Sequence, residues 1–130
     1  MEGPIQIALV DDHRLFRSGM AYLINNFHRY SVLFEAGDGE EMIRKINSKL
    51  KPHVVLLDIN MPKMDGLTFL RSLRRESLPL AATPAIVIST ESSPKDIAAA
   101  RAAGANFYLV KPVAQDTLIR YVGMLCGLPG

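Results

Sequence analysis

Acidic, hydroxyl and amine side chains stand at or just after the ends of four short apolar runs. They are Asp11 and Asp12 after IQIALV (5–10), Asp58 after HVVLL (53–57), Ser89 with Thr90 at the end of AIVIS (85–89), and Lys111 after NFYLV (106–110). Carboxylates a few ångströms apart repel by about 1 kcal/mol per pair in water and by about 4 kcal/mol at the intermediate dielectric of a protein surface. If the fold brings the three acids together, a cation is expected between them.

The oxygen ligands of these acids favour Mg²⁺. This ion keeps several waters and is usually held by one or two carboxylates together with phosphate oxygens. One acid is then free to react, and an Asp carboxylate can attack phosphorus and form an aspartyl phosphate. The hydroxyl and the ammonium would bind the oxygens of the incoming phosphoryl group. The residue types therefore predict phosphoryl uptake on an Asp at a strand end.

The elements that must position these groups alternate between two periodicities. The four runs above and SVLFEA (31–36) have the length and the β-branched or aromatic content of strands, and three are apolar almost throughout, as in strands covered on both faces. Apolar residues at helical spacing lie between them, over 16–27, 42–50, 67–73, about 94–103 and 118–125. Five strands, each followed by a helix, predict a doubly wound α/β fold with a parallel sheet and right-handed crossovers. Ligands of such sheets bind beyond the carboxyl ends of the strands.

Helix start signals agree with this division. Asp38 and Glu41 have the spacing of a capping box, and Ser93 followed by Pro94 provides a cap and a first-turn proline. Asp65 is expected to cap the helix that opens at Gly66. A single Asp at a strand end is also more often a helix cap than a ligand. Three acids on adjacent strands are what favour a cation site.

Composition excludes several classes. A chain of 130 residues with 48% hydrophobic content fits a single domain over 1–130 that buries roughly two thirds of its unfolded surface. One cysteine, Cys126, allows no intrachain disulfide, and we expect a reducing, cytoplasmic location without a signal peptide or membrane span. The net charge of +2 is spread along the chain, so nothing predicts direct nucleic-acid binding.

Five motifs in order give the chain a resemblance to a known family. They are LVDD (9–12), LLDINMPKMDG (56–66), IVIST (86–90), AGA (103–105) and YLVKP (108–112). Over essentially its whole length the sequence resembles a response-regulator receiver domain of two-component signalling, of the chemotaxis-regulator kind. The resemblance implies a five-stranded, flavodoxin-like sheet in the order 2-1-3-4-5 with helices on both faces.

The resemblance also implies the chemistry of the acids. It makes Asp58 the phosphoacceptor and a ligand of Mg²⁺, the cofactor. Asp11 and Asp12 become the acidic pair that organises the ion, and the backbone carbonyl of Asn60 becomes a further ligand. Such a domain catalyses its own phosphotransfer and dephosphorylation and is a signalling switch rather than a turnover enzyme.

The remaining implied roles concern the response to phosphorylation. Lys111 contacts the phosphoryl group, Ser89 supplies the switch hydroxyl, and Tyr108 is the aromatic side chain that changes rotamer. Read without the family, Tyr108 is equally well a packing residue. The Lys111–Pro112 bond is a candidate cis peptide.

Partners follow from the same resemblance. The donor would be a phosphohistidine on a histidine kinase or a histidine phosphotransfer protein. The helix after Asp12 is a predicted docking surface, with Leu15 and Phe16 beside Arg14 and Arg17. The output would pass to an unknown downstream protein through the face made by the fourth helix, the fifth strand and the fifth helix, without direct contact to nucleic acid or membrane.

Three other functions compete with this prediction. A Mg²⁺-dependent phosphohydrolase using Asp58 would need an acid two residues later, where the chain has Asn60. A dinucleotide or flavin module would need a glycine-rich turn after the first strand, where the chain has DDHRLF. A receiver-like interaction module without phosphotransfer normally lacks one or more of the acids. The output stays open between a stand-alone regulator of the chemotaxis type and a receiver cut from a longer DNA-binding regulator or hybrid kinase.

Overall fold

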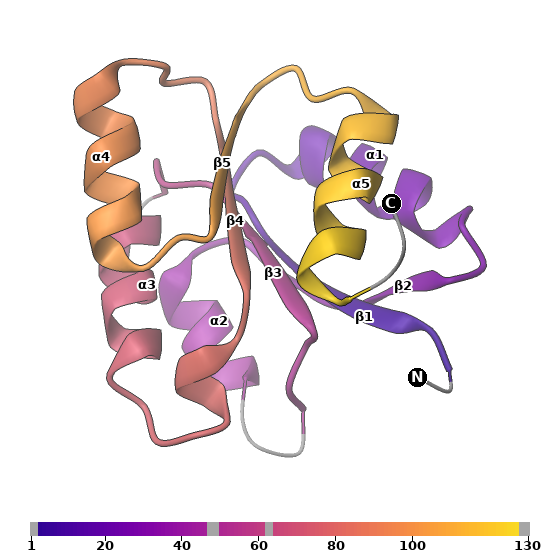
Figure 1. Cartoon of the computed structure of the whole chain (residues 1–130), viewed down its shortest axis with the longest axis horizontal. Coiled ribbons are helices and arrows are strands. Elements are labelled where there is room, and N and C mark those ends of the chain that lie inside the picture. Colours follow the sequence, from indigo (N-terminus) through magenta and orange to yellow (C-terminus); the bar gives the residue numbers. More distant parts are fainter. Residues whose placement is uncertain (1–2, 47–49, 62–63, 128–130) are drawn as a thin grey trace.

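A computed structural model describes residues 3–46, 50–61 and 64–127 of the chain. Within these ranges the parallel strands form one sheet in the order β2-β1-β3-β4-β5 (Figure 1). The strands are β1 (Ile5–Val10), β2 (Tyr30–Ala36), β3 (Val54–Leu57), β4 (Ala85–Ser89) and β5 (Phe107–Val110). The predicted doubly wound fold and strand order are confirmed, and the order reverses between β1 and β3.

The helices cover both faces of the sheet. α1 (Arg14–Asn25) and α5 (Gln115–Leu125) lie on one face, and α2 (Gly39–Lys45), α3 (Gly66–Arg74) and α4 (Pro94–Ala103) lie on the other (Figure 1). A single 3₁₀ turn, Leu80–Ala82, precedes β4 and was not predicted. None of the helices in the described ranges is long and apolar enough to cross a membrane.

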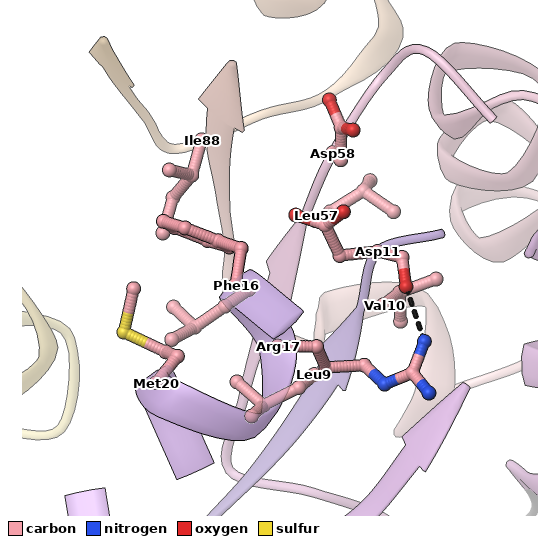
Figure 2. Close-up of a pocket in the computed structure, with 10 residues that line it drawn as sticks. Leu9, Val10, Asp11, Phe16, Arg17, Met20, Leu57, Asp58 and Ile88 are labelled. Carbon is pink, nitrogen blue, oxygen red and sulfur yellow. Dashed lines mark hydrogen bonds between the residues drawn. The ribbon is translucent and has the colours of Figure 1, made fainter. Parts of the chain in front are cut away.

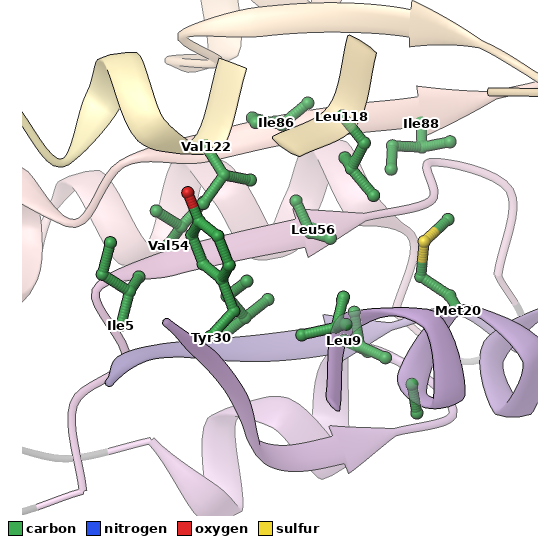
Figure 3. Close-up of a cluster of buried hydrophobic side chains, with 13 residues drawn as sticks. Ile5, Leu9, Met20, Tyr30, Val54, Leu56, Ile86, Ile88, Leu118 and Val122 are labelled. Carbon is green, nitrogen blue, oxygen red and sulfur yellow. The ribbon is translucent and has the colours of Figure 1, made fainter. Parts of the chain in front are cut away.

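Alternate residues of each central strand belong to different cores. In β1, Ile7 and Leu9 join the cluster beneath α1 and α5, which Figure 3 shows. Ala8 and Val10 join the cluster beneath α2 and α3. β3 follows the same alternation, with its residues at most 3% exposed. The strands are apolar throughout because both of their faces are covered. Because the strands are parallel, polar residues that directly follow them lie outside both cores, at the carboxyl-end edge of the sheet.

The predicted helix caps form. The Asp38 carboxylate accepts a hydrogen bond from the Glu41 amide at 2.9 Å, and the Asp65 carboxylate accepts one from the Thr68 amide at 2.8 Å. The Ser93 hydroxyl accepts from the Asp96 amide at 3.2 Å. These bonds satisfy donors that a helix N-terminus leaves unpaired and so fix where α2, α3 and α4 begin.

The second helix is shorter than its apolar stripe predicts. α2 ends at Lys45, and Ile46 has an extended backbone with ψ of 135°. The Ile46 side chain still packs against the core, whereas Leu50 is 38% exposed. Part of the predicted stripe is thus buried without helical backbone. Residues 47–49, on which the same prediction falls, lie outside the described residues.

Candidate functional site

Strand register brings the acids together. Val10 of β1 pairs with Leu57 of β3, so the residues that follow, Asp11 and Asp58, leave adjacent strands at the same level. The Asp58 amide donates to the Val10 carbonyl at 2.9 Å, which extends the ladder by one bond. Carboxylate oxygens of Asp11, Asp12 and Asp58 all lie within 4.8 Å of one another. The predicted convergence of the acids is therefore present in the structure.

Lys111 reaches this cluster from β5. Its amide donates to the Ser89 carbonyl at 2.8 Å, which holds the end of β5 against β4. Its ammonium lies 2.9 Å from an Asp11 oxygen and 3.9 Å from an Asp58 oxygen. The Lys111–Pro112 peptide is cis, in agreement with the prediction from the family resemblance. The Lys111 ammonium thus contacts both Asp11 and Asp58, and the shorter contact is with Asp11.

Asp11 is the most heavily bonded of the three acids. One carboxylate oxygen accepts from the His13 amide at 2.8 Å, and the other accepts from Lys111. The guanidinium of Arg17 donates to the main-chain carbonyl of Asp11 (Figure 2) and forms an ion pair with Glu35 at 3.0 Å. These contacts lock the first turn of α1 to the end of β1.

Burial raises the pKa of Asp58 above its usual range, and the negative charges of Asp11 and Asp12 raise that pKa further. A hydrogen bond from the Asn60 amide at 3.3 Å and the charge of Lys111 act in the opposite direction. The Asp58 side chain is 9% exposed. The ionised form of Asp58 is therefore held in an environment that does not fully compensate its charge.

The donor set fits Mg²⁺. Mg²⁺ binds oxygen at about 2.0 to 2.1 Å, and three carboxylate oxygens that all lie within 4.8 Å of one another are close enough to converge on one such ion. An ionised carboxylate has about four acceptor positions, which leaves Asp11 free sites besides its two hydrogen bonds. The uncompensated negative charge is what a divalent ion would neutralise. The role of the Asn60 carbonyl stays a prediction.

Ser89 and Tyr108 form a second, linked group. Ser89 is fully buried, and its hydroxyl oxygen accepts from the Glu91 amide at 3.1 Å. The Tyr108 hydroxyl donates to the Glu91 carbonyl at 2.7 Å. Burial raises the pKa of Tyr108, and the ring packs beside Ile59, Val87 and Ala100. The loop after β4 thus connects the predicted hydroxyl and the predicted aromatic switch.

Lys111 and Tyr108 lie on opposite sides of the sheet. Leu109 packs in the cluster beneath α1 and α5, and Lys111, two residues later, lies over the ring of Phe16 in α1. Tyr108, which directly precedes Leu109 and so points to the other face, packs against Ala100 of α4. Strand alternation therefore places the Lys111 ammonium on the α1 side and the Tyr108 ring on the α4 side.

The predicted docking residues of α1 separate into two sets. Leu15 is 81% exposed and Arg14 is exposed beside it. Phe16 and Arg17 turn inward: Phe16 lines the pocket that contains Asp58 (Figure 2), and Arg17 bonds to Asp11. The sequence-based prediction missed these inward contacts, although the spacing of Phe16 and Met20 marks the buried stripe of the helix.

Residues 7–123 match the family described as response regulator receiver domain. The chain is 37% identical over 117 residues to the nitrate/nitrite response regulator protein NarL of Escherichia coli K12, covering 90% of this chain and 52% of NarL. It is 39% identical over 111 residues to protein-glutamate methylesterase/protein-glutamine glutaminase 1 of Myxococcus xanthus, covering 85% of this chain and 31% of that protein. The chain spans about half of the NarL sequence and less of the esterase.

Solved structures agree with these matches. The signal receiver domain of a response regulator from Mycobacterium tuberculosis that bears the name NarL superposes with a TM-score of 0.86 at 30% identity, covering 96% of this chain and 98% of that one. CheY in the CheX–CheY–BeF₃–Mg²⁺ complex from Borrelia burgdorferi gives a TM-score of 0.83 at 26% identity, covering 95% and 90%. In both cases the likeness covers at least 95% of this chain.

Proposed function

The chain belongs to the response regulator receiver domain family of two-component systems, and on this premise we propose that it is a phosphorylation-activated switch with Asp58 as phosphoacceptor and Mg²⁺ as cofactor. The observation that carries the proposal is the cluster of three carboxylates within 4.8 Å, with the Lys111 ammonium between Asp11 and Asp58. The raised pKa of Asp58 supports the same assignment, because perturbed groups gather at reactive sites.

The proposed reaction is an in-line displacement at phosphorus. An oxygen of the Asp58 carboxylate forms a bond to the phosphorus of a phosphohistidine, and the phosphorus–nitrogen bond breaks with its electron pair remaining on the histidine. Asp11, Asp12, Asp58 and the Asn60 carbonyl would hold Mg²⁺, which would supply positive charge for the phosphoryl oxygens. Lys111 and Ser89 bind the remaining oxygens by charge-assisted hydrogen bonds. Hydrolysis of the acyl phosphate then restores Asp58.

The proposed donor is a histidine kinase or a histidine phosphotransfer protein. Arg14 and Leu15 provide an exposed basic and apolar start to α1 beside the acids, which suits docking of such a donor. The output face is proposed to be α4, β5 and α5, since Tyr108 of β5 links Ser89 to α4. Residues 1–130 would act as one receiver domain.

The rival functions are less well supported. A receiver-like module that only binds partners has no need of three converging acids, yet all three are present. A phosphohydrolase needs a general acid two residues after the nucleophile, and Asn60 cannot supply a proton there.

Incubation with acetyl phosphate and Mg²⁺, followed by intact mass measurement and peptide mapping, tests the proposal. We expect one added phosphoryl group in the wild type, none in Asp58→Asn, and no uptake when the metal is chelated. Asp65→Asn is the matched control, because Asp65 is an exposed helix cap and Asn caps equally well. An adduct mapped to another residue, or uptake by Asp58→Asn equal to that of the wild type, would overturn the assignment.

A further inference from the structure

The ammonium of Lys111 has a third neighbour that carries no charge. It lies 4.1 Å from the centre of the Phe16 ring, in addition to its contacts with Asp11 at 2.9 Å and Asp58 at 3.9 Å. A cation over an aromatic face within about 6 Å is attracted by the ring quadrupole, and the attraction grows as the pair is desolvated. The Lys111 side chain is only 11% exposed, so the contact is poorly screened by water.

Lys111 is proposed to bind a phosphoryl group on Asp58, but its shortest contact with a charged group is with Asp11. Asp11 is the partner at 2.9 Å, and in the proposed function Asp11 only binds the metal, whereas Asp58 binds the metal and also receives the phosphoryl group. A cation bound to Asp11 weakens the hold of Asp11 on the ammonium through competition and repulsion. A long lysine side chain released in this way is free to turn toward solvent. A contact that does not involve the acids is needed to keep it in place.

The Phe16 ring is placed to provide that contact. It packs against the cluster beneath α1 and α5 and lines the same pocket as Asp58 and Ile88 (Figure 2). The bond from Arg17 to the Asp11 carbonyl fixes this turn of α1 to the strand end. Because an aromatic ring has no formal charge, it attracts the ammonium without competing for a divalent ion.

We propose that Phe16 is a positioning residue, which holds the Lys111 ammonium beside Asp58 through a cation–π contact that is independent of Asp11. Its effect on phosphoryl uptake rests on the proposed function. The contact itself does not, because it is given by the distance between the Lys111 ammonium and the Phe16 ring alone. The proposal therefore has one readout of the contact and a separate readout of its consequence.

Proton NMR of the metal-free protein reads out the contact. A ring current from Phe16 is expected to shift the ε-methylene protons of Lys111 upfield relative to exposed lysines such as Lys95. Phe16→Leu should remove the shift, and Phe16→Tyr should keep it. Met20→Leu is the matched control, since Met20 lines the same pocket as Phe16 but has no aromatic ring to form a cation–π contact. An unshifted Lys111 in the folded wild type overturns the proposal.

The rate of phosphoryl uptake from acetyl phosphate reads out the consequence. At saturating Mg²⁺ we expect Phe16→Leu to be about tenfold slower, which corresponds to about 1.4 kcal/mol. Phe16→Tyr and Met20→Leu should stay within about twofold of the wild type. Stepwise fluorination of the Phe16 ring, which weakens the quadrupole at nearly constant volume, should slow uptake progressively.

Several results would separate this role from packing and from the proposed function. Equal rates across the fluorinated series, or a Phe16→Leu rate equal to the wild-type rate, overturn the positioning role. If Phe16→Leu fails to fold, the fluorinated proteins and Phe16→Tyr still decide the question. A wild type that shows the upfield shift and takes up no phosphoryl group overturns the proposed function while supporting the contact.

Discussion

Asp58→Asn is expected to stabilise the metal-free protein at neutral pH. Asp58 is nearly buried beside Asp11 and Asp12, and burial is the largest cause of its raised pKa. An amide is close to a carboxylate in size and still offers an oxygen to the Asn60 amide, which now bonds at 3.3 Å. The substitution therefore removes a poorly compensated charge and keeps the local hydrogen bond.

The size of the gain follows from the distances. At the largest separation of 4.8 Å, Asp11 repels Asp58 by about 3.5 kcal/mol at an effective dielectric of about 20. Lys111, at 3.9 Å, attracts Asp58 by about 4 kcal/mol under the same conditions. These two energies nearly cancel. Burial and the remaining repulsion from Asp12 therefore decide whether Asp58→Asn raises or lowers the free energy of unfolding. We expect the free energy of unfolding to rise by about 1 to 2 kcal/mol. Each kcal/mol should raise Tm by about 3 to 5 °C.

The pH dependence has a definite sign. Because the pKa of Asp58 is raised in the folded state above its ordinary value of 3.8, the native state binds more protons than the unfolded state between these two pKa values. Wild-type stability is therefore lost as the pH rises through the folded pKa. The advantage of Asp58→Asn should be complete at pH 7 and should shrink as the pH falls toward the ordinary carboxyl pKa.

Thermal unfolding in the presence of a chelator, from pH 4 to pH 8, measures this difference. Asp65→Asn should give no comparable gain, because Asp65 is exposed and both residues cap α3. Adding Mg²⁺ should stabilise the wild type and narrow its gap to Asp58→Asn. A variant no more stable than the wild type at pH 7, or a gap that stays constant down to pH 4, would refute the reasoning.

Three further predictions concern the metal, the switch and the scaffold. Asp12→Ala should remove Mg²⁺ binding while preserving the fold, and calorimetric titration giving wild-type affinity would contradict this. Beryllium fluoride should shift the amides of α4 and β5 less in Ser89→Ala and in Tyr108→Ala than in the wild type; equal NMR shifts in all three proteins would return Tyr108 to a packing role. Arg74→Lys should lower the free energy of unfolding by about 2 kcal/mol or more in urea titrations, because the donors of an ammonium share one nitrogen and cannot reproduce the four hydrogen bonds to carbonyls that the guanidinium forms from three separate nitrogens. The control Arg71→Lys, on an exposed side chain of the same helix, should change it by less than about 0.5 kcal/mol.

Local patterns in the sequence were enough to predict the sheet and the edge where the acids meet. Apolar runs of strand length, separated by helical stripes, leave only a parallel, doubly wound arrangement. In that arrangement the parallel strands end at one edge, so Asp11, Asp58 and Lys111 are expected at the same edge of the sheet. Helix caps such as Asp65 were equally predictable, because a cap and its amide partner are three residues apart.

Contacts between segments far apart in the chain were decided only by the tertiary structure. Lys111 pairs more closely with Asp11 than with Asp58 and lies over Phe16, and no spacing in the sequence indicates this choice. Arg74 looks like an ordinary basic residue at a helix end, yet it bonds the Gly104 carbonyl, 30 residues away, at 2.7 and 3.1 Å. Propensity and periodicity act over a few residues. The partner of a long side chain depends instead on the angle and depth at which whole helices pack on the sheet, which is set by all of the core contacts together.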